Sequence, residues 1–215
     1  MKNIALLLLA GLITASVSNT ALAQQTTKEL KKELKEKSIK QARKEAKAFK
    51  KQGYYVAPGA LPLDKQLEAA WLKQLMVDDQ GFPLYIVSTG TSVGQTQSAA
   101  KLQANETAKL ELVGQISNNI GALIENQIAN SQLDIEEATS VTKTVAASKN
   151  LIMLNIGRTL TLVVMYKKIN KNIEANVRIA YNNALAVEEA KKTIRKQLED
   201  ETDILQEKLD KLMSF

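Results

Sequence analysis

The chain of 215 residues contains neither cysteine nor histidine. Without cysteine it can form no disulfide, thiolate nucleophile, iron–sulfur cluster or cysteine-ligated zinc site. Without histidine it has no Ser-His-Asp triad, imidazole base or histidine-ligated metal. We therefore expect no metal and no cofactor. Hydrophobic residues at 45% and charged residues at 24% are nevertheless ordinary for a folded protein, and the length suits one domain with a sizeable core.

The first 23 residues have the pattern of a secretory signal peptide. Lys2 supplies the positive start, an apolar run extends from Ile4 to Ile13, and small residues stand at Ala21 and Ala23 before Gln24. The pattern predicts a mature chain that starts at Gln24 or Gln25. The apolar run is short for a membrane-spanning helix, although an uncleaved anchor is the alternative. We expect an exported protein of the periplasm or outer envelope, and one that is not lipidated because no cysteine is available.

The positive charge is concentrated between Lys28 and Lys51, where eleven Lys or Arg stand against four Glu. The segment is rich in helix formers and ends before Gly53, so a basic helix is predicted over 24–53. Ile39, Ala42, Ala46 and Phe49 form a narrow apolar stripe. Such a helix either meets an anionic partner such as lipid or polysaccharide, or docks on its own domain. We do not expect nucleic acid as a partner, because no aromatic residues interleave with the lysines.

Residues 54–63 hold two of the three prolines and are predicted to be a linker. Asp64 stands where an N-cap is expected, and a helix to about Val77 should follow. Residues 84–89 are rich in β-formers and predict a strand, after which GTSVG reads as a loop that opens onto a helix. Free backbone N–H groups at such a loop can hold an anion, so this loop is the candidate ligand site. Its candidate residues are Gly90, Thr91, Ser92 and Gly94.

A long helix is predicted from Gln97 to about Ala129, with its alanine-rich half lying on a sheet. Conversion to a strand after Asn119 is the main alternative. Asp134 and Glu137 then fit a capping box that begins a helix to about Asn150.

Alternating apolar residues predict a β-hairpin with its turn at Asn170 and Lys171. The register would pair Tyr166 with Ala175, Val164 with Val177 and Leu162 with Ile179. It would also set Lys167 opposite Glu174 on the wetter face. The residues expected to be buried under helices are Leu160, Leu162, Val164, Val177 and Ile179.

Asn183 is predicted to cap a final helix to about Met213, whose inward residues would be Val187, Ala190, Ile194, Leu198, Leu205 and Leu212. Residues 199–210 carry six acids and one lysine. We expect the basic helix to dock on or near this acidic segment, within one chain or between two as a homodimer through the terminal helices.

The run YIVSTGTSVGQTQSAAKLQANETAKLELVGQI, SKNL at 148–151 and the hairpin from Arg158 to Tyr181 resemble the lipoprotein-20-like domain of bacterial envelope proteins. The resemblance covers residues 84–182. The lysine-rich front and VAPGALPL are similar to secreted proteins of Bacteroidetes-type bacteria. The resemblance implies a compact α+β domain in the envelope and no assigned catalytic residues, and this chain lacks the lipid-bearing cysteine of that family.

The predicted fold is α+β, with a small, mainly antiparallel sheet of one hairpin and one strand, packed by long helices. The predicted organisation is a signal peptide (1–23), a basic helix (24–53), a linker (54–63), an α+β domain (64–183) and a C-terminal amphipathic helix (184–215). We expect a non-catalytic envelope module that binds an envelope protein or wall component, with contact to a membrane surface open.

Two other functions stay open. The first is a domain that binds a small ligand or glycan through residues 90–94. The second is a carboxylate-based hydrolase, which has less support because its acidic pairs, Asp78 with Asp79 and Glu136 with Glu137, lie in predicted turns or caps and not across a cleft.

Overall fold

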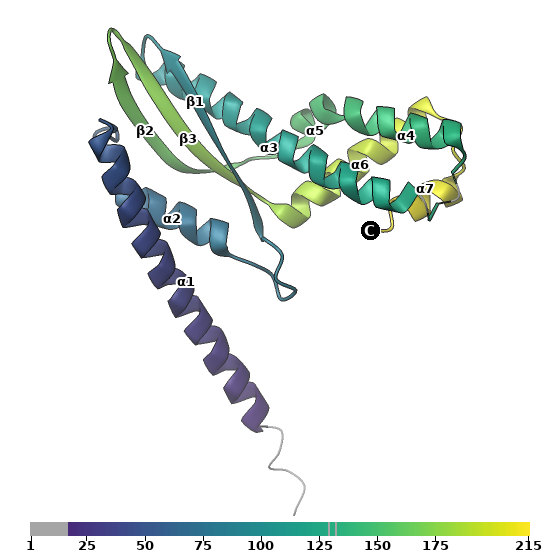
Figure 1. Cartoon of the computed structure of the whole chain (residues 1–215), viewed down its shortest axis with the longest axis horizontal. Helices are drawn as coiled ribbons and strands as arrows, with labels where there is room; N and C mark the ends of the chain where they lie inside the picture. The colour runs from purple at the N-terminus through teal and green to yellow at the C-terminus, as the bar shows by residue number, and fades with distance from the viewer. Residues whose placement is uncertain (1–16, 129, 132) are drawn as a thin grey trace, which may run out of the picture.

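A three-stranded antiparallel sheet with the strand order β1-β3-β2 organises the molecule (Figure 1). The computed structural model describes residues 17–128, 130, 131 and 133–215. In chain order the elements are α1 (Val17–Lys51), α2 (Leu63–Leu75), β1 (Tyr85–Gly94), α3 (Gln97–Ile128), α4 (Ile135–Ala147), α5 (Lys149–Asn155), β2 (Leu160–Ile169), β3 (Asn172–Asn182), α6 (Asn183–Glu201) and α7 (Gln206–Leu212). The α+β class with helical N- and C-terminal regions is confirmed.

The β2–β3 hairpin turns at Asn170 and Lys171, as predicted, and Asn170 adopts a left-handed φ of 54° there. Tyr166 pairs with Ala175, and Lys167 lies opposite Glu174. Val164 also pairs with Val177, so the predicted register holds over this part of the hairpin. The register then shifts between Thr161 and Val163. Ile179 therefore pairs with Thr161, and the predicted pairing of Ile179 with Leu162 is wrong. The bulge at Leu162 changes the face to which the first residues of β2 point.

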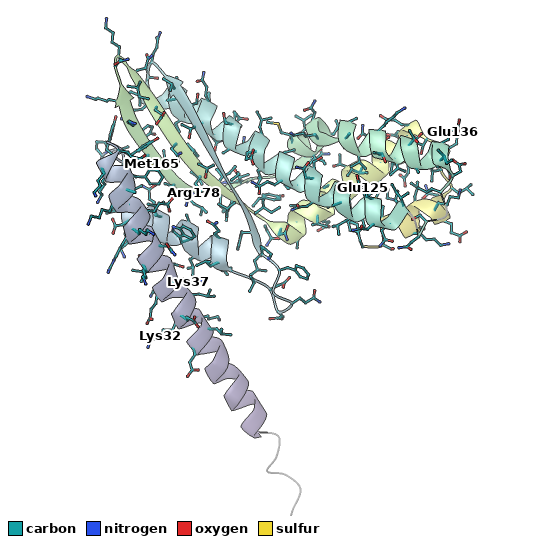
Figure 2. All side chains as sticks on the ribbon, viewed as in Figure 1. Lys32, Lys37, Glu125, Glu136, Met165 and Arg178 are labelled. Carbon is teal, nitrogen blue, oxygen red and sulfur yellow. The ribbon has the colours of Figure 1, made fainter. Side chains whose placement is uncertain are left out.

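Both faces of the sheet are covered, which corrects the predicted burial of β2. Val177 and Ile179 are fully buried beneath α3, as expected, but Leu160 is 45% exposed. Val163 and Met165, on the opposite face, are at most 1% exposed and pack with α1 and α2 (Figure 2). A strand that is buried on both faces needs apolar residues without alternation, and the run from Leu162 to Tyr166 provides them.

The helix α3 lies against β1 at unusually short range. An ideal Cβ built on Gly90 would fall 2.0 Å from the carbonyl oxygen of Ala104 and 2.3 Å from the nitrogen of Ala108. One on Gly94 would lie 2.7 Å from the nitrogen of Ala100. The buried Ser88 hydroxyl donates a hydrogen bond of 2.8 Å to the Ala108 carbonyl. The alanine-rich half of α3 therefore lies on the sheet, as predicted.

The second half of α3 leaves the sheet and forms a helical bundle with α4 to α7 (Figure 1). It remains helical through Ile128, so the alternative of a strand after Asn119 is wrong. The capping box of Asp134 and Glu137 is present at the start of α4. The helix ends at Ala147, and α5 follows directly. The core of this bundle is formed by Ile116, Ile120, Ile124, Val141, Ile152, Ile194, Leu198, Leu209 and Leu212.

The C-terminal region differs from the single helix that the sequence predicted. Asn182, not Asn183, caps α6 by accepting a hydrogen bond from the Leu185 N–H. The helix ends at Glu201, and α7 begins at Gln206 after an extended connection. This break leaves Leu205 66% exposed, although it was expected to point inward. The two helices pack into the bundle beside α3 and α4.

The segment 54–63 is attached to the sheet at its start, where residues 54–57 are half-buried, whereas residues 58–62 are exposed. Gly53 ends α1 with a φ of +87°, after which Tyr55 forms a β-bridge to Tyr166. The Tyr54 hydroxyl donates a hydrogen bond to the Glu174 carboxylate. Burial, helped by this carboxylate, raises the pKa of Tyr54 to about 12. Pro62 occupies the N-cap of α2, so Asp64 lies in the first turn and is not the cap.

We predict that Gly90→Ala destabilises the protein by at least ~3 kcal/mol, because the new methyl group would displace the backbone of α3. Urea unfolding measures this loss. Gly121→Ala in α3 is the control, since its Cβ would lie 3.6 Å from a Val145 methyl and alanine favours helix. Equal stability of the two variants would contradict the close approach of α3 to β1.

Candidate functional site

The candidate ligand residues Gly90, Thr91, Ser92 and Gly94 lie within β1 and not in a loop. Gly90 and Gly94 lie beneath α3, where they allow the close approach of the helix. Thr91 accepts a hydrogen bond from Asn176, and Ser92 donates one to Gln103. Alternate backbone N–H groups of this segment pair with β3. The segment therefore does not present the converging N–H groups that a phosphate-binding loop requires.

One member of each acidic pair considered for a hydrolase has local structural partners. The Asp78 carboxylate accepts hydrogen bonds from the N–H groups of Gln80 and Phe82 and so holds the turn before β1. Glu137 completes the capping box and forms an ion pair of 2.6 Å with Lys208, whose hydrogen bond lowers the pKa of Glu137. Among the described residues, no group of three or more acidic residues is placed to hold a metal ion.

The predicted signal-peptide residues are described only in part. Residues 1–16 lie outside the described chain. Ala21, Ala23 and Gln24 belong to α1, which begins at Val17, but their side chains are not among those described. The predicted cleavage point thus stays a prediction. None of the helices in the described part of the chain has the length and hydropathy needed to cross a bilayer.

The C-terminal half of α1, residues 38–51, packs on the body of the protein, and we call it the docked half. Ala42 and Ala46 are buried against α2, and Phe49 is half-buried beside them. The Glu45 carboxylate accepts hydrogen bonds of 2.6 Å from both the Trp71 indole and the Arg178 guanidinium. One carboxylate therefore joins α1 to α2 and to the central strand β3.

This arrangement corrects the expectation that α1 docks on the acidic C-terminal segment. Figure 1 shows α1 and α2 at one side of the sheet, whereas the bundle that contains α6 and α7 extends from the other. Two acids of that segment have a partner within the bundle, because Arg195 binds both Glu199 and Asp210. Packing of the apolar stripe and the single Glu45–Arg178 pair decide where α1 docks. Pairing of the terminal helices between two chains is untested.

The N-terminal half of α1 extends beyond α2 and away from the sheet (Figures 1 and 2). Its lysines Lys31, Lys32, Lys35 and Lys37 are all exposed. Where side chains are described, the one ion pair made by α1 is that of Glu45 with Arg178. Since Arg178 takes up the charge of Glu45, three glutamates remain to balance eleven basic residues between Lys28 and Lys51. The projecting half is thus a cationic surface of moderate charge, since residues 28–37 carry five lysines and three glutamates, a net charge of +2, and the docked half carries the larger excess of positive charge.

A basic groove continues this surface onto the docked half of α1. An open groove of about 600 Å³ is lined by Arg43, Lys47, Lys50 and Lys51, together with Ala46 of α1 and Asp64 of α2. The four basic residues recur at helical spacing, so they share one face of α1. Asp64 is the single carboxylate among the groove residues. We call the exposed lysines of the projecting half and the four basic groove residues the cationic face of α1.

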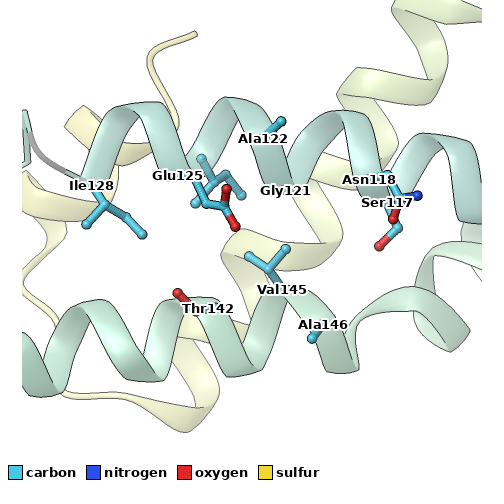
Figure 3. A pocket seen from close by; sticks show the side chains of 10 residues that line it. Ser117, Asn118, Gly121, Ala122, Glu125, Ile128, Thr142, Val145 and Ala146 are labelled. Carbon is cyan, nitrogen blue, oxygen red and sulfur yellow. The ribbon is translucent and has the colours of Figure 1, made fainter.

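Two further hollows have a weaker chemical character. The groove between α3 and α4 has a volume of about 280 Å³ and is lined chiefly by small or apolar residues, including Gly121, Ala146 and Val145, with Glu125 at its side (Figure 3). Another, of about 680 Å³, lies where Phe82, Leu123 and Phe215 meet the start of α6. The Lys191 ammonium lies 4.2 Å from the centre of the Phe215 ring and donates to the Phe215 oxygen. Neither gathers charge of one sign as the cationic face does.

Comparisons of the chain with protein-family models, curated proteins and solved structures find no match. The sequence identified the basic segment but not its division into a docked half and a projecting half. The charge along α1 does not predict that division, because the division depends on the length of α2 and on the pairing of Glu45 with Arg178.

We predict that Glu45→Ala destabilises the protein by about 2 to 3 kcal/mol, because it leaves the largely buried Arg178 without its ion-pair partner. Urea unfolding gives the change, and the fluorescence of Trp71, the one tryptophan, reports whether α1 stays docked. The exposed Glu36→Ala is the control and should remain within ~0.5 kcal/mol of the parent. Loss of stability in both variants alike would contradict a specific anchoring role for Glu45.

Proposed function

We propose that the protein is an exported, non-catalytic interaction module of the cell envelope, which binds an anionic membrane surface through the cationic face of α1. One observation carries the proposal: a helix with a net charge of +7 between Lys28 and Lys51 is anchored by its second half, while its first half projects with exposed lysines. An anchored helix keeps its orientation on the body, so binding through it also orients the α+β domain.

The composition of the projecting half supports a lipid surface as the partner. Leu30 is 55% exposed and lies one turn before the half-buried Leu34, about 120° around the helix from Ala42 and so away from the side that packs on α2. Lys31 and Lys35 flank these leucines. A helix with leucines beside lysines can place its apolar side at the acyl boundary while its ammonium groups meet lipid phosphates. Each lysine near an anionic membrane contributes about 1 kcal/mol.

An envelope location is supported by the signal-peptide pattern and by the resemblance to lipoprotein-20-like domains. Without a cysteine for lipid attachment, a cationic helix is an alternative means of holding the protein at a membrane. The two other functions have less geometric support. The segment 90–94 lies in a strand beneath α3, and the hydrolase carboxylates hold a turn and a helix cap.

We predict that replacing Lys31, Lys32, Lys35 and Lys37 by Gln weakens binding to phosphatidylglycerol-containing vesicles at least ~10-fold, because four phosphate contacts are lost. Vesicle sedimentation measures the binding. The matched control replaces four exposed lysines on other elements, Lys101, Lys143, Lys168 and Lys171, and removes the same charge.

The control should bind like the parent protein, and high salt should weaken parental binding. An equal loss in both variants would show a net-charge effect and contradict the role of α1. Equally tight binding to vesicles of phosphatidylcholine alone, or binding to wall polysaccharide and not to vesicles, would contradict the lipid partner.

We also predict that the chain, expressed with its own N-terminus in a bacterial host, is exported and cleaved after Ala23. Mass spectrometry of the exported protein should show Gln24 as the first residue. Ala23→Asp should block cleavage, since the site needs a small residue, whereas Ala48→Asp on exposed α1 should be processed normally. An exported protein that retains Met1 would contradict the cleaved signal and favour an uncleaved anchor.

A further inference from the structure

The two edges of the sheet differ in how their backbone groups are used. On the outer edge of β2, Tyr55 exchanges two hydrogen bonds of 2.8 Å with Tyr166. One residue pair further along, the Gln66 side chain accepts a hydrogen bond of 2.8 Å from the Val164 N–H. The bulge at Leu162 further interrupts this edge. The chain therefore covers the β2 edge with its own residues.

The β1 edge is open, and the register identifies its outward groups. The Asn183 N–H donates 2.9 Å to the Leu84 carbonyl at the start of the β1–β3 ladder. Antiparallel pairs alternate between hydrogen-bonded and non-hydrogen-bonded positions, so the even residues from Ile86 on direct their backbone groups toward β3. The odd residues direct theirs outward. No residue in the described chain forms a hydrogen bond with the outward groups of Val87, Thr89, Thr91 and Val93.

The sequence of β1 contains none of the features that usually protect an edge strand. Its ten residues include no charge and no proline, and its register with β3 has no bulge. Proteins normally blunt such an edge with lysine, proline, a bulge or a covering segment, because it can pair with another strand. An open edge of this length is suited to receiving a strand.

A groove runs beside this edge between β1 and α3, and an added strand would pack against its α3 side. Its volume is about 540 Å³. Val87, Ser88 and Thr89 form one side, and Lys149 of α5 closes one end; the residues of α3 that line it are Thr107, Leu110, Glu111 and Gln115. Leu110 is 49% exposed here and offers apolar surface to alternate side chains of a bound segment.

We propose that the β1 edge binds an extended peptide segment of a partner protein, which adds to the sheet as a fourth strand antiparallel to β1. The outward groups of Val87, Thr89, Thr91 and Val93 bond the peptide backbone. Peptide side chains on one face lie under α3 near Leu110, and those on the other lie beside Thr89 and Thr91. Backbone bonds supply the affinity in this binding mode, and the side-chain contacts select the sequence.

A second copy of the chain does not fit this edge. The segment VSTGTSV, Val87–Val93, reads the same in both directions, so an antiparallel copy centred on Gly90 would pair like residues. However, α3 lies directly over Gly90. Adjacent strands are about 4.8 Å apart, whereas packed helices need 8–10 Å, so the two α3 helices would collide. A peptide without a covering helix keeps the favourable pairing and avoids the collision.

The first test is amide hydrogen exchange of the intact protein by NMR. In the free protein the amides of Thr89, Thr91 and Val93 should exchange rapidly, while those of Ser88, Gly90 and Ser92 are protected by β3. The probe is a synthetic peptide with the sequence YIVSTGTSVG, flanked by lysines for solubility. It should slow exchange at Thr89, Thr91 and Val93 at least ~10-fold. Protection of these amides in the free protein, or no slowing at saturating peptide, would overturn the proposal.

A matched pair of variants at Thr91 separates the contribution of the backbone N–H to peptide binding from that of the side chain. Thr91→Pro removes one outward N–H and should abolish peptide binding with the fold retained, because proline is tolerated where the N–H faces solvent. Thr91→Ala loses the same hydroxyl and should still bind. Equal binding by both variants, unfolding of Thr91→Pro alone, or a wild-type dimer that Thr91→Pro dissociates would each overturn the proposal.

Discussion

The close contact between α3 and β1 is the constraint on which the rest of the structure depends. Gly90 and Gly94 leave no side chain between the strand and the helix, and Ala100, Ala104 and Ala108 present the smallest possible helix surface. Because α3 is held there, its second half leaves the sheet at a fixed angle and becomes the frame for α4 to α7. The same contact places a helix over Gly90 and so decides what can approach the outer edge of β1.

The parts of the fold that depend on local periodicity could be predicted from the sequence. The length of α3, the capping box at Asp134 and the turn at Asn170 follow from residues within a few positions of each other. The bulge at Leu162 and the burial of Val163 and Met165 could not be predicted in this way, because they depend on α2 covering a second face of the sheet. The uninterrupted apolar run from Leu162 to Tyr166 is typical of a strand that is buried on both faces. We interpreted it instead as an alternating strand with one buried face.

The candidate site shows the same limit. Composition identified the basic segment, but opposite net charge was a poor guide to its docking partner, since exposed ion pairs contribute little. The position of α1 instead depends on Glu45, a single acid within a basic helix, and on Arg178, a single base within a strand. Gly90 and Gly94 were interpreted as parts of an anion-binding loop, whereas they lie in β1. These glycines allow the close packing of α3 on β1. The alternation of apolar and polar residues along a strand does not predict that contact.

The order of the strands also has a consequence for folding kinetics. Within the hairpin, Ile169 pairs with Asn172, so β2 and β3 can meet after closing a short loop. By contrast, Ile86 of β1 pairs with Tyr181, which lies 95 residues further along the chain. Contacts between distant residues carry a larger loop-closure cost and form more slowly. The hairpin should therefore form early, and β1 should join it late together with α3, so the central strand β3 passes through a stage in which it is itself an unpaired edge.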